Sequence, residues 1–282
     1  MKSITSLFRA GGSSFIVLAP AGTQVSNAFR TVEVDAGLRE HFLAEMQRFR
    51  GSVYRDDGAI LPSELTNDGR HYLPVDDNSW HVLTLQSDGT ICACLRYLEQ
   101  PARHFDQLLV RQAALMQSSI WAPKLKWAVE REMLAAKRAG ISFGEVGGWA
   151  ISPERRLTME PLRTILATYG LLELLGSCSG IATATRRHGS APILRRIGLA
   201  PIVVDDEELP AYYDPKYRCE MEVLRFDSRC PNPKFRNWVN ELASLLKAAP
   251  VICNRDPRRS AQRVPVMVPA ASVPTPALAG LF

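Results

Sequence analysis

One stretch near the middle of the chain limits the possible folds more than any other. Residues 143–152 read as a β-strand that contains Glu145 and two adjacent glycines. An apolar helical run at 162–175 and a second strand at 180–185 follow it. Strand, helix and strand in this order predict a βαβ unit, in which the two strands run parallel.

Gly147 and Gly148 lie inside the first of these strands. Paired glycines in a strand usually mark a bulge or a close backbone approach by a ligand. A bulge would separate the two parallel strands and leave a backbone N–H unpaired in the gap. A thioester bound there would face that N–H, while Glu145 would face an incoming nucleophile. This arrangement suits an acyltransferase. The alternative is that the glycines make room for a large side chain such as Trp127 or Trp149.

The composition excludes several classes of protein. The chain has 282 residues, of which 46% are hydrophobic and 22% charged, as in ordinary globular proteins. It contains no long apolar run and no secretion signal at its start, so we expect a cytoplasmic protein. Six cysteines without a Cys-x-x-Cys pair indicate buried thiols, with neither a disulfide framework nor a metal site. A net charge of +5 fits an acidic partner but does not argue for nucleic acid.

The chain divides into three parts. Residues 1–28 are rich in Gly, Ser and Ala and predict an N-terminal arm with at most a short strand. Residues 29–253 predict one α/β domain, a mixed sheet with flanking helices and a helical insertion at about 104–139. Residues 254–282 are rich in Pro, Ala and Val and predict a disordered tail. The other elements expected in the domain are strands at 31–35, 201–204 and 218–226, and helices near 38–49, 105–117, 125–139, 190–196 and 235–247.

The clearest hairpin spans residues 80–98. An Asp-Gly pair at 88–89, between two β-prone runs, predicts a two-residue type I′ turn. The register of that turn places His81 opposite Arg96. Trp80 then lies opposite Tyr97, on the other face of the hairpin.

Glu145 and Arg96 are the candidate catalytic residues. Glu145 begins the central strand, where a carboxylate can accept a proton from an attacking amine, directly or through a water. Arg96 lies on an interior strand, where an arginine is rarely left without a partner. Candidate partners are Glu145, Asp76 and Asp77. Such a cluster would either hold the base ionised and in place or serve as a structural salt-bridge network.

Arg155, Arg156 and Thr158 stand where the chain turns into the helix after the central strand. The N-terminus of a helix attracts phosphate through its free N–H groups and its dipole. The alternative is a solvated basic loop.

The order of these elements resembles the GNAT acyltransferase fold. Residues 38–204 resemble, within that fold, the acyl-homoserine-lactone synthases and the related N-acyl amino acid synthases. The matching residues are Arg50 and Tyr54 of an Arg-x-x-x-aromatic motif, Asp76 before the hairpin, Arg96 within it, and Glu145 of the central strand.

The resemblance implies an N-acyltransferase that moves a fatty acyl group from a thioester carrier to the amine of an amino acid or related metabolite. The product would be an N-acyl amino acid or an autoinducer-like quorum-sensing signal. The implied donor is acyl carrier protein, or acyl-coenzyme A in its place, with no tightly bound cofactor. The implied substrate-binding residues are Arg50, Tyr54, Asp76, Trp80, Gly147, Gly148, Trp149, Thr183 and Thr185. The implied carrier- or phosphopantetheine-binding residues are Arg155, Arg156, Thr158, Arg186 and Arg187, with Lys124, Lys126, Arg131, Lys137 and Arg138 completing a basic docking surface.

The chain also departs from these families at two places. Gly148 stands where the autoinducer synthases have an arginine, and residues 156–161 lack the small residues of the acetyltransferase phosphate loop. Two alternative functions stay open. One is a GNAT acetyltransferase that uses a small acyl-coenzyme A. The other is a non-catalytic sensor that binds acyl chains or acyl carrier protein.

Overall fold

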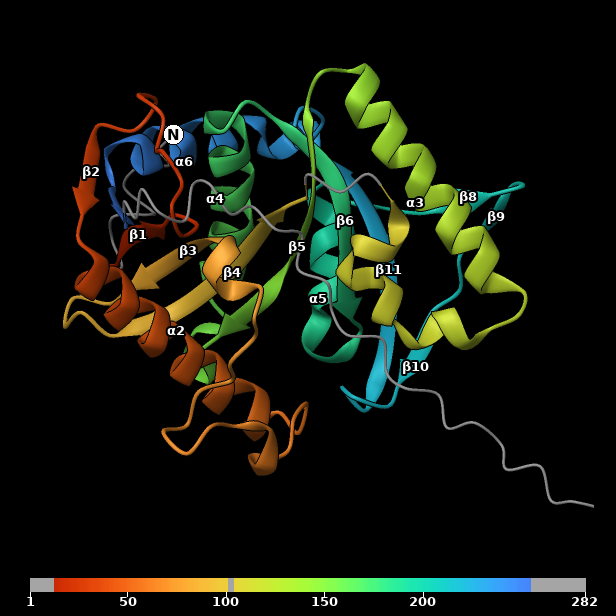
Figure 1. Ribbon diagram of the computed structural model, residues 1–282, viewed down its shortest axis with the longest axis horizontal. Helices are drawn as coiled ribbons and strands as arrows, with labels where there is room; N and C mark the ends of the chain where they lie inside the picture. Colours follow the sequence, from red (N-terminus) through yellow and green to blue (C-terminus); the bar gives the residue numbers. More distant parts are fainter. Residues whose placement is uncertain (1–12, 101–103, 255–282) are drawn as a thin grey trace, which may run out of the picture.

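The computed structural model describes residues 13–100 and 104–254 (Figure 1). The tail expected at 254–282 therefore falls, from residue 255 onward, outside the described residues. Within the described ranges, no helix is both long and apolar enough to cross a membrane.

The secondary structure confirms an α/β fold. The strands are β1 (Ser14–Leu18), β2 (Thr31–Val34), β3 (Trp80–Leu85), β4 (Ile91–Glu99), β5 (Ser142–Ile151), β6 (Cys178–Thr185), β7 (Ala200–Pro201), β8 (Val203–Val204), β9 (Glu207–Glu208), β10 (Tyr212–Asp214), β11 (Cys219–Asp227) and β12 (Pro250–Cys253). The α-helices are α2 (Ala36–Asp56), α3 (Trp121–Arg138), α4 (Glu160–Leu174), α5 (Ser190–Ile197) and α6 (Arg236–Ala248).

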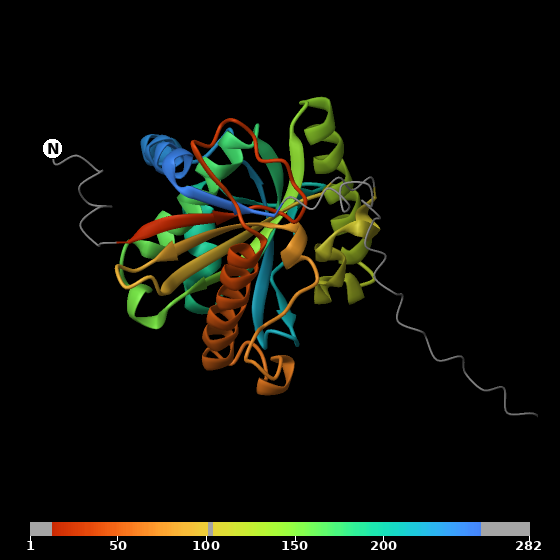
Figure 2. The same cartoon turned by 60° about the vertical axis from the view of Figure 1, so that its left-hand side comes forward.

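A mixed sheet forms the centre of the molecule, in the order β10-β11-β6-β5-β4-β3-β1-β12-β2 (Figures 1 and 2). Helix α2 contacts β4 and β5, and α3 contacts β5 and β6, whereas α4 contacts β3 and β4 and also packs on α6. Neighbouring residues of β4 lie on opposite faces of the sheet, because Cys94 packs with residues of α2 and Leu95 packs with residues of α4. Helices α2 and α3 therefore share one face of the sheet, and α4 and α6 cover the other.

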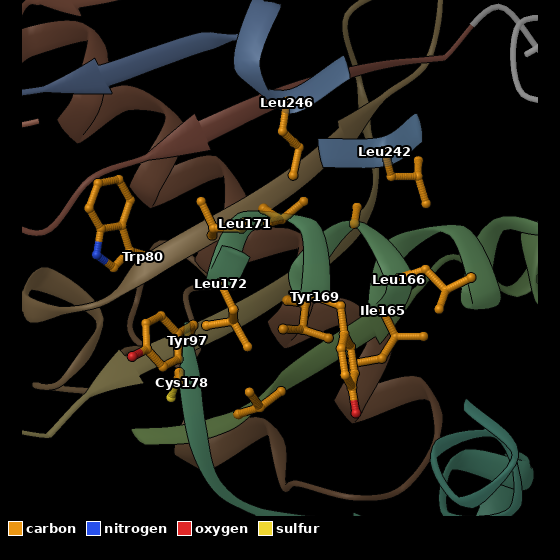
Figure 3. Packing of buried hydrophobic residues seen from close by; sticks show 14 of the residues in the cluster. Trp80, Tyr97, Ile165, Leu166, Tyr169, Leu171, Leu172, Cys178, Leu242 and Leu246 are labelled. Carbon is orange, nitrogen blue, oxygen red and sulfur yellow. The ribbon is translucent and has the colours of Figure 1, made fainter. Parts of the chain in front are cut away.

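The largest buried cluster lies on the α4 side of the sheet (Figure 3). Leu166 and Leu171 of α4 are fully buried there, as are Leu242 and Leu246 of α6. Burying a leucine side chain contributes about 1.5–3 kcal/mol. This apolar layer therefore stabilises one face of the sheet. The polar residues described below lie on the other face, which α2 and α3 cover.

The βαβ unit forms as the sequence predicts, and its two strands part. Strands β5 and β6 pair in parallel from Ser142 with Cys178 to Val146 with Ala182. Beyond these pairs β5 continues along β4, while β6 continues along β11. The β4–β5 register shifts where Cys94 faces Ala150 and Arg96 faces Gly147, so two residues of β5 face one of β4. The predicted bulge is confirmed, and Gly148 adopts a positive φ of 63° within it.

The hairpin register is confirmed, but the predicted turn type is wrong. His81 lies opposite Arg96, and Trp80 lies opposite Tyr97. A type I′ turn needs a positive φ at two central residues, and in this loop only Gly89 has one. Thr84 pairs with Ala93 but Leu85 pairs with Ile91, so Cys92 is an extra residue on β4 beside the loop. That irregularity lies at the loop end of the hairpin and leaves the pairing at His81 and Arg96 unchanged.

The α-helix expected at 105–117 is also wrong, because this segment forms three 3₁₀ turns, Phe105–Gln107, Leu109–Gln112 and Ala114–Gln117. The amides of Leu109 and Val110 donate to the Glu145 carboxylate instead of to carbonyl oxygens one helical turn earlier. The sheet therefore supplies the acceptors that a continuous helix would have supplied itself. Strand β1, expected at most as a short strand in the arm, pairs with β3 and β12 within the sheet.

Candidate active site

A buried cluster of two arginines and one carboxylate lies beneath the bulge of β5. Arg50 of α2 donates to both carboxylate oxygens of Asp76, with Nη1 to Oδ1 at 3.0 Å and Nη2 to Oδ2 at 2.7 Å. Arg96 of β4 donates from Nη1 to the same Oδ1 at 3.4 Å. Of the partners considered for Arg96, Asp76 is the one that forms the ion pair, whereas Asp77 pairs with Arg39.

The two arginines keep Asp76 ionised in the interior. Burial alone would raise the pKa of the Asp76 carboxyl, but the charge and hydrogen bonds of Arg50 outweigh it and hold that pKa well below its usual range. The same carboxylate raises the pKa of Arg50 despite the opposing effect of burial. Arg50 and Asp76 are both fully buried. The side chains of Arg50 and Asp76 bond to each other in the interior of the protein.

Polar neighbours complete the surroundings of Asp76. Gln47 donates from Nε2 to Oδ2 at 3.0 Å, and Arg50 Nη2 also donates to the carbonyl of His71 at 2.6 Å. His81 Nε2 lies 2.9 Å from the Asp76 carbonyl oxygen, so this nitrogen carries the proton and Nδ1 does not. Burial lowers the pKa of His71 and of His81 to about 4 each. Both histidines are therefore neutral at pH 7.

Arg96 joins this cluster to the bulge. Its Nη2 lies 3.5 Å from where a Cβ at Gly147 would stand, and its Cβ lies 3.3 Å from the equivalent point at Gly148. Arg50 Nη1 is also 3.3 Å from that point at Gly148. Within the described chain Arg96 Nε has no hydrogen-bond partner. A cationic group with a free donor therefore stands against the backbone of the bulge. Gly148 thus also makes room for large side chains, as the alternative interpretation of the glycines expected, and these belong to Arg50 and Arg96.

Tyr54 and Trp149 also meet at the bulge. Tyr54 donates from its hydroxyl to the carbonyl of Trp149 at 3.3 Å. This bond ties the end of α2 to the bulged part of β5. The ring of Trp149 packs against the α4-side cluster, and its Nε1 lacks a partner among the residues that the structure describes.

Glu145 lies on the same face, at the last paired positions before β5 and β6 separate. Its Oε1 accepts from the Val110 amide at 2.9 Å. Its Oε2 accepts from the Leu109 amide at 2.8 Å and from Gln100 Nε2 at 2.9 Å. Burial raises the pKa of this carboxyl, although the hydrogen bonds oppose the shift. Glu145 therefore anchors the 3₁₀ segment and has a strengthened affinity for a proton.

The threonines of β6 and the hairpin tryptophan occupy different surroundings. Thr183 is exposed and lies on the same face of β6 as Ile181, two residues earlier, which is buried and packs with the α3 cluster. It therefore lies on the Glu145 face, beyond the point where the strands part. Thr185 donates to the carbonyl of Arg187 at 3.1 Å. Trp80 lies in the core on the opposite face, stacked on Phe29 with ring centroids 6.0 Å apart, so the sheet separates it from the cluster.

Acidic or polar groups hold the basic residues at the strand ends. Arg155 donates to Gln86 Oε1 at 2.6 Å, and Thr158 donates to the Arg155 carbonyl at 2.7 Å. Arg156 binds both carboxylate oxygens of Asp57 at 2.8 Å. Arg187 donates to the carbonyl of that same residue at 2.7 Å.

Arg186 differs from the other basic residues at these strand ends. It pairs with Glu220 at 3.0 Å and with Glu222 at 2.9 Å, both on β11, and its own side chain is half exposed. The charge of Arg186 is therefore balanced by carboxylates of β11, the strand that pairs with β6.

Sequence reasoning missed three participants in this region. Asp57 follows α2 in an Asp-Asp-Gly sequence that indicates only a loop. Gln100, which follows β4, binds Glu145, and so do the amides of Leu109 and Val110 in a segment whose periodicity predicted a helix. Among residues 13–100 and 104–254, no group of three or more His, Cys, Asp or Glu side chains is arranged to hold a metal ion.

No protein-family model matches the chain, and no curated protein matches it in sequence. The comparison with solved structures decides the fold. The coenzyme A-dependent acyl-homoserine lactone synthase BjaI, solved with MTA, superimposes with a TM-score of 0.52 at 15% identity. The match covers 86% of this chain and 92% of BjaI. The fold is similar to that of an acyl-homoserine-lactone synthase.

A second BjaI structure, with SAM and isopentyl-CoA, gives a TM-score of 0.50 at 16% identity over the same shares of both chains. FeeM, an N-acyl amino acid synthase from uncultured soil microbes, gives a TM-score of 0.42 at 12% identity. It aligns with 70% of this chain and 88% of its own. The two BjaI structures confirm, for the fold, the resemblance of the sequence motifs to acyl-homoserine-lactone synthases.

Proposed function

We propose that the protein is an N-acyltransferase, which moves an acyl group from a pantetheine thioester to the amine of an amino acid or related metabolite. The separation of β5 and β6 after Val146 and Ala182 carries this proposal. A pantetheine arm entering between the strands would reach the backbone of the bulge. Glu145 lies at the fork, the point where β5 and β6 separate, and Arg96 lies beside the bulge.

The reaction would proceed by direct attack. The amine nitrogen bonds to the thioester carbonyl carbon, and the carbon–sulfur bond breaks. Glu145 receives the proton that the amine loses, and the departing sulfur takes up a proton to leave as a thiol. The backbone N–H near Gly148 or Trp149 would stabilise the negative charge that develops on the carbonyl oxygen.

Two properties of Glu145 support its role as the base. Its raised pKa favours proton uptake. Its three hydrogen bonds leave Oε1 with a single donor, Val110, so one acceptor position of the carboxylate stays available for an amine or a water.

Arg96 is suited to bind the acceptor. The guanidinium of an arginine beside the bulge fits a carboxylate, which favours amino acids over simple amines. Arg50 and Asp76 are positioning residues in this account, because they are buried and bound to each other.

The surface of α3 fits an acidic carrier protein as the donor. Ile120, Trp127 and Leu134 are exposed and seven residues apart, so they lie on one side of the helix. Arg131 stacks on the Trp127 ring at 4.5 Å and adds positive charge to this side. An exposed apolar stripe with basic neighbours is typical of a docking surface for an acidic partner. BjaI, in contrast, is described as coenzyme A-dependent.

The test is to supply the purified protein with a mixture of amino acids and one of two donors, acyl carrier protein loaded with an acyl group or acyl-coenzyme A. Mass spectrometry of the products names donor and acceptor together. We expect an N-acyl amino acid from the carrier-borne donor. A product formed only from acetyl-coenzyme A would favour the acetyltransferase alternative. Binding of acyl carrier protein without loss of its thioester would favour the sensor.

A further inference from the structure

Asp57 connects two arginines that follow different strands, Arg156 after β5 and Arg187 after β6. Its carboxylate binds Arg156, with Nη1 to Oδ1 and Nη2 to Oδ2 both at 2.8 Å. Its carbonyl oxygen accepts from Arg187 Nη1 at 2.7 Å. Arg187 Nη2 in turn donates to the carbonyl of Arg218 at 2.7 Å.

These contacts lie at the open end of the fork. Arg156 follows β5, and Arg187 follows β6. Because the two strands run parallel, their carboxyl ends meet at one edge of the sheet, beyond the point where they part. Asp57 therefore spans the side at which the strands are separated.

The stability of α2 does not explain a carboxylate at this position. Asp57 is the C-cap residue of α2, and the C-terminal end of a helix dipole is negative, which disfavours a nearby anion. One side-chain partner of Asp57, Arg156, comes from the segment after β5. The charge of the Asp57 carboxylate is therefore compensated in part by Arg156.

A phosphate would bind Arg156 in the same way as Asp57 does. A guanidinium binds carboxylate and phosphate through the same pair of parallel N–H bonds. The Arg156 side chain is 23% exposed and that of Asp57 is 18% exposed, so solvent and solutes reach the pair. An incoming phosphate and the Asp57 carboxylate would compete for one guanidinium.

We propose that Asp57 is a specificity-determining residue, an internal anion that occupies Arg156 and so weakens binding of free phosphate-bearing donors such as coenzyme A. This inference rests on the proposed function for its donor class. A donor on a carrier protein gains additional binding from protein–protein contact and can displace the carboxylate. Free coenzyme A has no such contact. Asp57 thus favours the carrier-borne donor.

Direct binding of coenzyme A, measured by calorimetry at low salt, tests the inference without any turnover. We expect Asp57→Asn and Asp57→Ala to bind coenzyme A at least tenfold more tightly than the unaltered protein. Asp56→Asn is the matched control, because Asp56 is the neighbouring, exposed carboxylate that pairs with Arg55. It should leave the affinity within about twofold, as expected for an exposed charge.

Arg156→Gln shows whether the gain depends on this arginine. It removes the same ion pair as the Asp57 variants, and we expect no gain in coenzyme A binding from it alone. Combined with Asp57→Ala, it should abolish the gain. Unchanged affinity in both Asp57 variants, or a full gain that persists with Arg156→Gln, would overturn the inference. Absence of acyl transfer by the unaltered protein would instead count against the proposed function, and these binding results would stand independently.

Discussion

Asp76 and Arg50 form a two-bond ion pair, at 3.0 and 2.7 Å, in which neither side chain is exposed to solvent. Removal of one partner from such a pair leaves an uncompensated charge in the interior. The pair therefore has a strong effect on stability, although its position next to Arg96 also connects it to the site.

Asp76→Asn should lower the free energy of unfolding by about 3–5 kcal/mol, because Arg50 and Arg96 lose their shared counter-charge. Asp77→Asn is the control, since the neighbouring Asp77 pairs with Arg39 but is 39% exposed. Its loss should change stability by about 1 kcal/mol or less. Urea unfolding of the two variants measures the difference, and equal losses would contradict the account.

Gly148→Ala should destabilise the bulge by about 1–3 kcal/mol, because alanine is strained at a φ of 63°. The added Cβ would also stand 3.3 Å from Arg50 Nη1 and from Arg96 Cβ. Gly147→Ala is the matched control, with a single neighbour at 3.5 Å and no positive φ. Thermal unfolding should separate the two variants, and a larger loss at Gly147 would contradict the bulge geometry.

The stability of the protein should fall as the pH is lowered from about 6.5 to about 4. His71 and His81 have pKa values near 4 in the folded protein, where burial disfavours their charged forms, against 6.5 in the unfolded chain. The unfolded state therefore binds more protons in this window, and the stability that the neutral histidines contribute above pH 6.5 is lost as the pH falls. Each histidine can increase the slope of the free energy of unfolding against pH by up to about 1.4 kcal/mol per pH unit.

His81→Gln should reduce the slope of stability against pH in this window. His41→Gln, which replaces an exposed histidine of α2, is the control for a histidine substitution outside this cluster. Glu145 acts in the opposite direction, because a raised pKa contributes stability that is lost as the pH rises. Denaturant unfolding at several pH values measures the slopes, and identical slopes in His81→Gln and the unaltered protein would refute the assignment.

Trp127→Ala should raise the KM for a carrier-borne donor several-fold and leave kcat unchanged, because the ring is exposed on α3 and stacks on Arg131, whereas Glu145 lies on β5. Val34→Ala is the control, an exposed apolar residue on the edge strand β2 at the far end of the sheet. Steady-state kinetics with acyl-loaded carrier protein as the donor measures both KM and kcat. A fall in kcat without a change in KM would argue against docking at α3.

Local patterns were sufficient for the elements that bring Glu145 and Arg96 to one face. The Asp-Gly signal set the pairing of His81 with Arg96 even though the turn itself is of another type. The glycine pair predicted the bulge, because a positive φ is readily adopted only by glycine. These features depend on residues that are close in sequence.

Contacts between distant segments could not be predicted in the same way. The amides of Leu109 and Val110 donate to the Glu145 carboxylate, which replaces the carbonyl acceptors of a regular helix. Asp57 binds Arg156 across 99 positions of the chain. No periodicity or propensity encodes which of several candidate charges will meet, and for the same reason the sequence left three possible partners for Arg96.

Single-turnover transfer of an acyl group to the acceptor amine shows whether Glu145 is the base, when Glu145→Gln is compared with Glu99→Gln. Glu99 is an exposed carboxylate on β4 that bonds to Ser142, so it is a matched control. If Glu145 is the base, its variant should remain folded by circular dichroism and lose about 100-fold or more in rate, while Glu99→Gln stays close to the unaltered protein. A folded Glu145→Gln protein that transfers the acyl group at the unaltered rate would contradict the account.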